Sequence, residues 1–266
     1  MIKKISALIK GGMIEGIAFR ASYIISFLSS IMYFIVIYSL WKAIYSSSFE
    51  DKVHGMTFEE TILYLVLATA LGSFIEIQLV WEMESKFQSG TIIFDITKPM
   101  SFPKYLFFEM FGRRVDYFIA VFVPIFVILM ICFKCADVWM NNLFVFLFGS
   151  FFSIIISFLI DFIVGIMVFY THSTWGINIM KTMIISLCSG AMIPIDFFPT
   201  SLNKVLSFLP FRCIYDIPIR LLIRNNLSIF EYLELFCYQL FWIAILLFIS
   251  NRAWKKARRV ILINGG

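Results

Sequence analysis

The stretch L-F-V-F-L-F-G-S-F-F-S-I-I-I-S-F-L-I-D-F-I-V-G-I-M-V-F-Y, residues 143–170, decides the fold of this chain. Its 28 residues include one charged side chain, Asp161. A helix of about 20 apolar residues crosses the roughly 30 Å hydrocarbon core of a bilayer, so this stretch is long enough to span a membrane. A lone carboxylate inside it predicts that one side of the helix faces protein or water rather than lipid. The stretch therefore indicates an integral membrane protein.

The composition extends this interpretation to the whole chain. Of its 266 residues, 61% are hydrophobic and the mean hydropathy is +0.91, whereas soluble domains are about 45–50% apolar. We expect one all-α membrane domain covering residues 1–266, with six transmembrane helices and short connections. Hydropathy places the six spans at residues 21–41, 61–80, 115–133, 143–170, 180–195 and 232–249.

The distribution of Lys and Arg predicts the orientation. With both termini on one side, that side carries fifteen basic residues, Lys181 among them, and the other side carries seven. The positive-inside rule then puts both termini in the cytoplasm and the protein in the cell membrane. The formal charge of +5 comes from basic residues at the ends of apolar runs, so it indicates topology and not nucleic-acid binding.

The first twenty residues differ from a signal peptide because lysines interrupt their apolar positions. Ile2, Ile5, Ile9 and Met13 recur at helical spacing and predict an amphipathic helix lying on the membrane surface. The Gly11-Gly12 pair is expected to let this helix bend before the first span.

Residues 81–114 form a long polar connection on the predicted cytoplasmic side. Gly90 is placed to end the helix that leaves the second span, and Pro99 ends a short helix with an apolar side. We expect a stiff projecting element that receives force from a partner protein. Its candidate contact residues are Glu82, Glu84, Lys86, Gly90, Thr91, Ile92, Ile93, Ile96, Lys98 and Pro99.

The outer connection, residues 196–231, is too apolar for a solvated loop. Together with Pro194 just before it, the connection contains prolines that favour short broken helices re-entering the outer leaflet. Membranes tolerate such backbone where protein or a water-filled cavity covers it. The four prolines are Pro194, Pro199, Pro210 and Pro218.

Four short motifs, in this order, resemble the ABC-2 type transporter permease family, in a branch whose export substrates are uncharacterised. They are G-T-I-x5-K-P at 90–99, F-Y-T-H-S-T-W-G-I-N at 169–178, S-G-A-M-I-P-I-D-F-F-P at 189–199 and L-P-F-R-C-I-Y-D-I-P at 209–218. With the amphipathic helix and the six predicted spans, the resemblance covers nearly the whole chain. It implies a dimer with an identical or related permease, above two nucleotide-binding ATPase subunits.

The sequence is consistent with an ATPase on a separate polypeptide. It contains no G-x-x-x-x-G-K-[ST] motif to cradle nucleotide phosphates. The resemblance therefore implies a non-catalytic permease without a cofactor of its own, with ATP and Mg²⁺ bound by the partner. We expect export of a hydrophobic or amphipathic substrate from the cytoplasm. The permease would move that substrate with energy from the partner's ATP hydrolysis.

Two acids lie well inside predicted spans and are candidates for the substrate path. Asp161 shares a helix face with Ser157 and other small residues, which is typical of a side that faces the helix bundle. A packing role and a transport role are equally open for Asp161. Glu76 lies about one turn from the predicted end of its span, which favours access to water or pairing with a loop cation.

Other polar residues carry weaker signals. Ser22, Ser26, Ser29, Ser30 and Tyr33 form a stripe on the first span that is more typical of helix packing than of a substrate site. The five cysteines, including Cys132 and Cys135, show no metal-site or disulfide spacing, and no metal cluster is predicted.

Two other function classes compete with the exporter. A proton-coupled secondary carrier using Asp161 and Glu76 would need no ATPase, but internal repeats typical of such carriers are not evident. A membrane-embedded enzyme would need a nucleophile–base pair or a metal site on the spans, and neither is evident.

Overall fold

The computed structural model describes residues 2–18, 20–47, 52–133, 136–171, 173–224 and 227–264, and these are almost entirely helical. Among the described residues, five helical segments are long and apolar enough to cross a membrane. Their ranges are Ile24–Ser47, Phe58–Gln88, Phe102–Phe133, Val138–Thr171 and Ile229–Val260. Six spans were predicted from the sequence.

Three of these segments are interrupted. The second consists of α3 (Phe58–Ile75) and α4 (Leu79–Gln88), the third of α6 (Phe102–Tyr117), the π turn η1 (Phe118–Phe122) and α7 (Val123–Phe133), and the fourth of α8 (Ala136–Gly165) and α9 (Val168–Thr171). The first is α2 (Arg20–Ser47) and the last is α13 (Ile229–Asn264). In the third segment, Pro124 has no N–H and would clash with the carbonyl four residues earlier, so the wide π turn falls where a regular helix is disfavoured.

The fifth predicted span, at residues 180–195, is the one that none of these five long segments matches. Helix α10 covers Trp175–Cys188, not 180–195, and its 14 residues are about 21 Å long. Gly190 follows with φ of 86°, in the left-handed region that ends helices, and Pro194 leads into the short 3-10 helix η2 (Ile195–Phe197). Hydropathy missed this end because Ala191, Met192 and Ile193 continue the apolar run beyond it.

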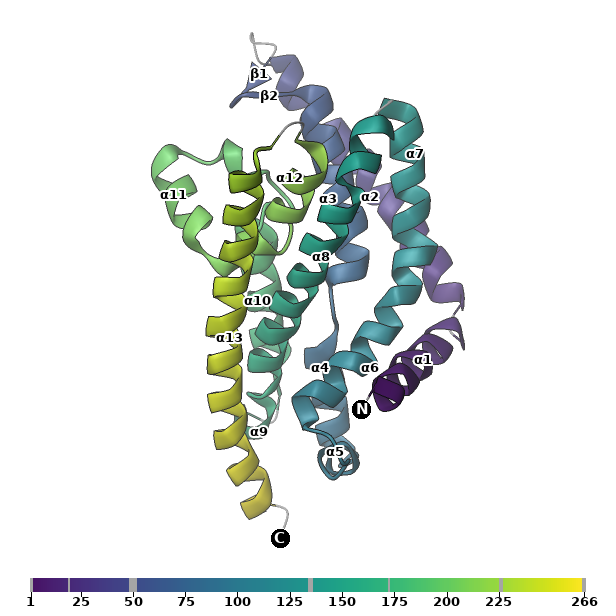
Figure 1. The fold of residues 1–266 in the computed structure, drawn as a ribbon, viewed down its shortest axis with the longest axis vertical. Coiled ribbons are helices and arrows are strands. Elements are labelled where there is room, and N and C mark those ends of the chain that lie inside the picture. The colour runs from purple at the N-terminus through teal and green to yellow at the C-terminus, as the bar shows by residue number, and fades with distance from the viewer. Residues whose placement is uncertain are drawn as a thin grey trace.

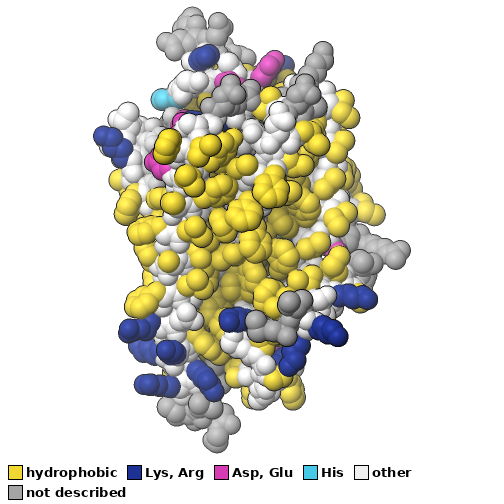
Figure 2. Space-filling model, viewed as in Figure 1, with side chains coloured by type: hydrophobic (Ala, Val, Ile, Leu, Met, Phe, Trp, Pro, Cys, Tyr) yellow, Lys and Arg dark blue, Asp and Glu magenta, His cyan; other side chains and the backbone are white. Residues whose placement is uncertain are grey.

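Shorter elements gather at the two ends of the molecule (Figure 1). One end, here the α5 end, carries α5 (Ile92–Ile96), α1 (Ile2–Ala18) and the C-terminus. The opposite end, here the hairpin end, carries the antiparallel strands β1 (Lys52–Val53) and β2 (Met56–Thr57). Near it lie α11 (Thr200–Phe208), the 3-10 helix η3 (Pro210–Cys213) and α12 (Asp216–Ile223). Figure 2 shows an apolar band between the ends, with Lys and Arg side chains gathered toward the α5 end.

Helix α8 lies at the centre of the bundle and packs against α13, α12 and α4. A polar clamp joins three elements there, because Gln239 of α13 donates to the carbonyls of Gly149 on α8 and Cys213 in η3, both at 3.1 Å. Ser153 of α8 donates to the same Cys213 carbonyl at 2.7 Å. By contrast, α2 lies at the periphery, and most of its apolar side chains are exposed in the isolated chain.

Helix α1 crosses α6 with the two backbones in direct contact. A Cβ atom added at Gly12 would lie 2.5 Å from the carbonyl oxygen of Glu109, and one added at Gly112 would lie 2.4 Å from that of Ile9. Such close approach is possible only where the side chain is a hydrogen atom. The predicted bend at Gly11 and Gly12 is absent, since α1 is one continuous helix and Gly12 serves as its contact with α6.

We predict that Gly112→Ala separates α1 from α6 and lowers the thermal unfolding temperature of the protein in lipid nanodiscs. The added methyl group meets rigid backbone, which cannot move aside as a side chain does. Gly11→Ala is the matched control, because a Cβ atom there meets nothing within 4 Å and alanine favours a helix by about 1 kcal/mol. Equal unfolding temperatures for Gly112→Ala and Gly11→Ala would contradict the crossing.

Candidate functional site

The second long segment breaks at residues 76–78, between α3 and α4. The amide of Glu76 still bonds to the carbonyl of Gly72 at 2.9 Å, but the helix does not continue to provide a donor for the carbonyl of Ser73. Arg114 of α6 supplies one, with its Nη1 at 3.3 Å from that oxygen. The guanidinium therefore caps the broken end of α3, whose carbonyls carry partial negative charge.

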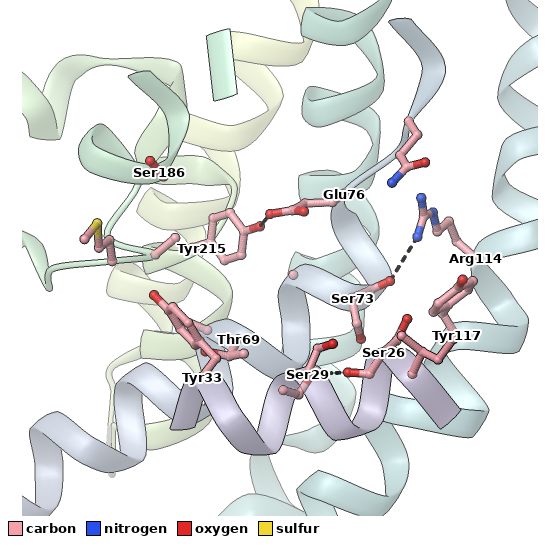
Figure 3. A pocket seen from close by; sticks show the side chains of 17 residues that line it. Ser26, Ser29, Tyr33, Thr69, Ser73, Glu76, Arg114, Tyr117, Ser186 and Tyr215 are labelled. Carbon is pink, nitrogen blue, oxygen red and sulfur yellow. Dashed lines mark hydrogen bonds between the residues drawn. The ribbon is translucent and has the colours of Figure 1, made fainter. Parts of the chain in front are cut away.

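A cavity of about 550 Å³ opens beside this break (Figure 3). This volume is within the range of roughly 300–1,000 Å³ that is typical of small-molecule binding sites. Its walls come from α2, α3, α6, the end of α10 and the segment after α10. Polar lining residues include Ser26, Ser29, Ser30, Tyr33, Thr69, Ser73, Glu76, Gln78, Arg114, Tyr117, Ser186 and Tyr215.

Glu76 is exposed to this cavity. Tyr215 donates a hydrogen bond from its hydroxyl to Glu76 Oε1 at 3.1 Å, and Figure 3 shows the carboxylate turned toward Tyr215. Among the described residues, no Lys or Arg lies within ion-pair distance of it. The helical segment continues to Gln88, so Glu76 lies much farther from its end than the single turn expected. Of the two environments expected for Glu76, pairing with a loop cation is not found among the described residues, whereas the cavity gives the carboxylate an exposed position.

A second cavity, of about 230 Å³, shares Glu76, Gln78 and Tyr215 with the first. Asp161 lines it and forms a 2.6 Å ion pair with Lys181 of α10. Asp161 is 2% exposed and the Lys181 side chain is 14% exposed, so the acid is buried and its partner is partly buried. Ser157 lines the same cavity, one turn from Asp161 on α8. The structure thus brings the three predicted path residues, Glu76, Asp161 and Ser157, to the walls of one cavity.

Several residues of this site were not found from sequence. Lys181 was treated as a loop charge, but it pairs with Asp161 inside the bundle. Arg114 was assigned to the loop side of its span, and Tyr215 had no assigned role. The stripe of Ser26, Ser29, Ser30 and Tyr33 lines the cavity, although packing was the preferred interpretation. The side chain of Ser22, together with Cys135 and His172, lies outside the described residues.

At the α5 end, charged side chains fasten α4, α5 and α6 together. Lys86 of α4 lies 3.0 Å from Glu82, 2.8 Å from Asp95 of α5 and 3.4 Å from Glu109 of α6. Lys98 lies 2.6 Å from the other oxygen of Asp95. The predicted contact residues Glu82, Lys86 and Lys98 are therefore engaged within this chain.

The apolar residues of α5 divide into a buried and an exposed group. Ile92 is buried in the core and Ile96 is half-buried, so the three isoleucines do not form one outward face as expected. Ile93 and Phe94 are 53% and 72% exposed at the tip of the element.

The remaining predicted contact residues differ in exposure. Glu84 is buried and accepts hydrogen bonds from the amide and the hydroxyl of Thr174, at 3.2 and 2.7 Å. Gly90 has φ of 72°, while Thr91 and Pro99 are exposed.

The segment with the four predicted prolines is anchored by a buried acid. Asp216 accepts from Arg212 at 2.8 Å and from Arg220 at 2.7 Å, and Arg220 also pairs with Asp196 at 2.7 Å. Tyr64 of α3 donates to Asp216 at 3.4 Å, which ties this segment to the second span. Three prolines precede or begin helical turns and the fourth lies within the first turn of a helix: Pro194 before η2, Pro199 before α11, Pro210 at the start of η3 and Pro218 in α12.

The site is a polar cavity with charged walls inside an apolar bundle. Among the described residues, no group of three His, Cys, Asp or Glu side chains could hold a metal ion. The profile of the family described as ABC-2 family transporter protein matches residues 31–265. The chain belongs to the ABC-2 transporter family. Searches of curated proteins and of solved structures each returned no match.

Membership in the ABC-2 family confirms the resemblance identified from the four sequence motifs. The chain is an integral, multi-pass membrane protein of a transporter family whose members are typically non-catalytic permeases. Membership in an ABC transporter family implies an ATPase partner.

We predict that Asp161→Leu destabilises this ABC-2 protein by up to about 3 kcal/mol, because it leaves the partly buried Lys181 ammonium without its partner. The double variant Asp161→Leu/Lys181→Met is expected to recover most of that loss, since both charges are replaced by apolar groups of similar size. Thermal unfolding in nanodiscs measures both variants. A double variant no more stable than Asp161→Leu would show that the pair does not matter to stability.

We also predict that acid loosens α5. Burial raises the pKa of Asp95, but the hydrogen bonds and charges of Lys86 and Lys98 more than offset it, and the pKa lies below its ordinary value. The stabilising contribution is therefore present near neutral pH and is lost as pH falls below about 4. Amide hydrogen exchange across residues 90–98, corrected for intrinsic rates, should rise over that range. In the Asp95→Asn variant the corrected exchange rate of the same amides should already be high at pH 7 and should not change as the pH falls.

Proposed function

We propose that this chain is the membrane-spanning permease of an ATP-binding cassette exporter, with ATP hydrolysed by a separate subunit. The observation that carries the proposal is the polar cavity beside the broken second segment, in a chain of the ABC-2 family. Discontinuous helices of this kind are used by transporters to build substrate sites within the membrane. The cargo is a hydrophobic or amphipathic molecule moved out of the cytoplasm.

In this proposal the chain crosses the membrane six times, with the α5 end in the cytoplasm. The fourth segment ends toward the α5 end, whereas α13 begins near the hairpin end (Figure 1). In this assignment the chain crosses the membrane again between them, and α10 with the turn after it makes this fifth crossing along the chain. The Lys and Arg side chains near the α5 end support a cytoplasmic assignment for that end (Figure 2).

The tip of α5 is the proposed contact with the ATPase. Ile93 and Phe94 offer an exposed apolar surface, and the ion pairs of Lys86 and Asp95 hold the element against α4 and α6. A stiff element that carries a small apolar surface can seat in a groove and transmit a push. Two residues of the earlier expectation lie outside this surface, because Ile92 is buried in the core and Glu84 accepts hydrogen bonds from Thr174.

A second permease chain, identical or related, completes the proposed transporter. The first long segment supports this, since its α2 side chains are largely exposed and one face of α2 lines the polar cavity. In the re-entrant assignment, the stretch from Pro194 to Arg224 lies on or within the outer leaflet. The buried Asp216 with its two arginines supports that assignment, because membrane-embedded backbone needs protein cover and paired charges.

Purification of the tagged chain from its native membrane in mild detergent tests the function. We expect an ATPase subunit containing a P-loop to co-purify in stoichiometric amount. A chain that purifies without any nucleotide-binding subunit, and yet transports in proteoliposomes when a proton gradient is applied, would replace the exporter with the proton-coupled carrier.

We predict that Ile93→Asp inserts and folds normally but loses the ATPase on purification, because a carboxylate in a desolvated apolar groove costs a few kcal/mol. Phe94→Asp should act in the same way. Ile93→Leu is the matched control and should retain the partner, since it keeps an apolar side chain of equal volume. ATPase recovery and coupled hydrolysis measure the effect, and full retention by Ile93→Asp would move the contact away from α5.

A further inference from the structure

The charges around the large cavity are arranged in an uncommon way. Asp161 has Lys181 as a cationic partner, and Asp216 has two arginines. Glu76 and Arg114, which both line the cavity, take part in no ion pair among the described residues. A carboxylate and a guanidinium thus face the same space without neutralising one another.

The surroundings of Glu76 suit a cation. Its carboxylate accepts one hydrogen bond, from Tyr215, and retains further acceptor capacity. The negative end of α3 lies directly before it, because the helix stops at Ile75. Tyr33 lines the same cavity, and aromatic side chains next to a carboxylate are typical surroundings of a bound ammonium group.

The surroundings of Arg114 suit an anion. One nitrogen of the guanidinium donates to the carbonyl of Ser73, while the group carries five N–H donors in all. Its guanidinium carbon lies 5.1 Å from the centre of the Tyr117 ring, which holds the plane in place. Figure 3 shows Arg114 on the opposite side of the cavity from the Tyr215 hydroxyl, with Glu76 turned away from it.

Part of the cavity wall is apolar. Ile25 of α2 lines it and is 63% exposed, in an apolar segment long enough to span the membrane. A ligand with its polar part in the cavity could therefore leave an alkyl chain among the lipid tails beside α2.

We infer that the cavity binds the head group of a zwitterionic amphiphile, with its ammonium at Glu76 and its anionic group, phosphate or carboxylate, at Arg114. This inference rests on the proposed export function, because it names the class of cargo for the same cavity. It predicts that a ligand needs both charges, whereas an uncharged or singly charged amphiphile with the same chain binds less well.

Binding to the full chain in nanodiscs tests the inference without the ATPase. The probes are four oleoyl or oleyl amphiphiles: lysophosphatidylethanolamine carries both charges, lysophosphatidate only the anionic group, oleylamine only the ammonium, and monooleoylglycerol neither. We expect the first to bind at least about tenfold more tightly than the other three, the effect of one hydrogen bond to a charged group.

Two variants assign the charges. Glu76→Gln should weaken lysophosphatidylethanolamine binding about tenfold while leaving lysophosphatidate unchanged, and Arg114→Gln should weaken both. The matched controls are Glu234→Gln and Arg252→Gln, which change exposed residues that do not line the cavity. Thermal unfolding of each variant checks that it is folded.

Photolabelling of the unmodified chain covers the case in which a variant fails to fold. A lysophosphatidylethanolamine carrying a diazirine near its head group should label peptides from residues 24–47 and 58–88. Equal binding of all four amphiphiles, variants that behave like their controls, or labelling confined to α8 and α13 would each overturn the inference. Tight binding of lysophosphatidylethanolamine without co-purification of an ATPase would support the inference and contradict the proposed ATPase coupling. Co-purification of an ATPase without binding of this amphiphile would support the coupling and contradict the inference.

Discussion

A helix that breaks inside a membrane must find new partners for its backbone, and this requirement organises the centre of the molecule. The carbonyl of Ser73 loses its donor where α3 stops, and lipid has none to offer. Arg114 takes that place from the neighbouring segment. Because the guanidinium is held there, Glu76 can turn away into a space lined by hydroxyl groups of α2 and by Tyr215.

The two ends of the molecule are built on a different principle from the centre. At the α5 end, Lys86 joins three elements through carboxylates, and at the hairpin end Asp216 joins two arginines of its own segment and Tyr64 of α3. In both places each charged group is paired with nearby groups of the same chain. These pairs hold the elements together and leave little unpaired charge to bind a ligand. The centre keeps charges that are not neutralised, and that difference separates the scaffold from the site.

Much of the architecture could be predicted from sequence because apolar length is a local property. The 28 residues 143–170 lie within a single apolar segment, and the family followed from four short motifs. The end of α10 could not be predicted from hydropathy, since Gly190 ends the helix by its backbone angle within an apolar run. Glu76, Asp161 and Ser157 were found as isolated polar residues inside spans. Lys181, Arg114 and Tyr215 were missed because their roles depend on contacts between segments far apart in the chain.

The crossing of α1 and α6 has a practical consequence for shortened forms of the protein. No side chains separate the two helices at Gly12 and Gly112, so α1 covers the backbone of α6 directly at that point. A chain from which residues 2–18 are deleted would present the bare peptide groups around Gly112 to detergent or lipid head groups. A bulky fusion on α1 that displaced this helix would also disturb the contact of Gly12 with the backbone of Glu109. An affinity tag is therefore better placed at the C-terminal end of α13 or on a long, flexible leader.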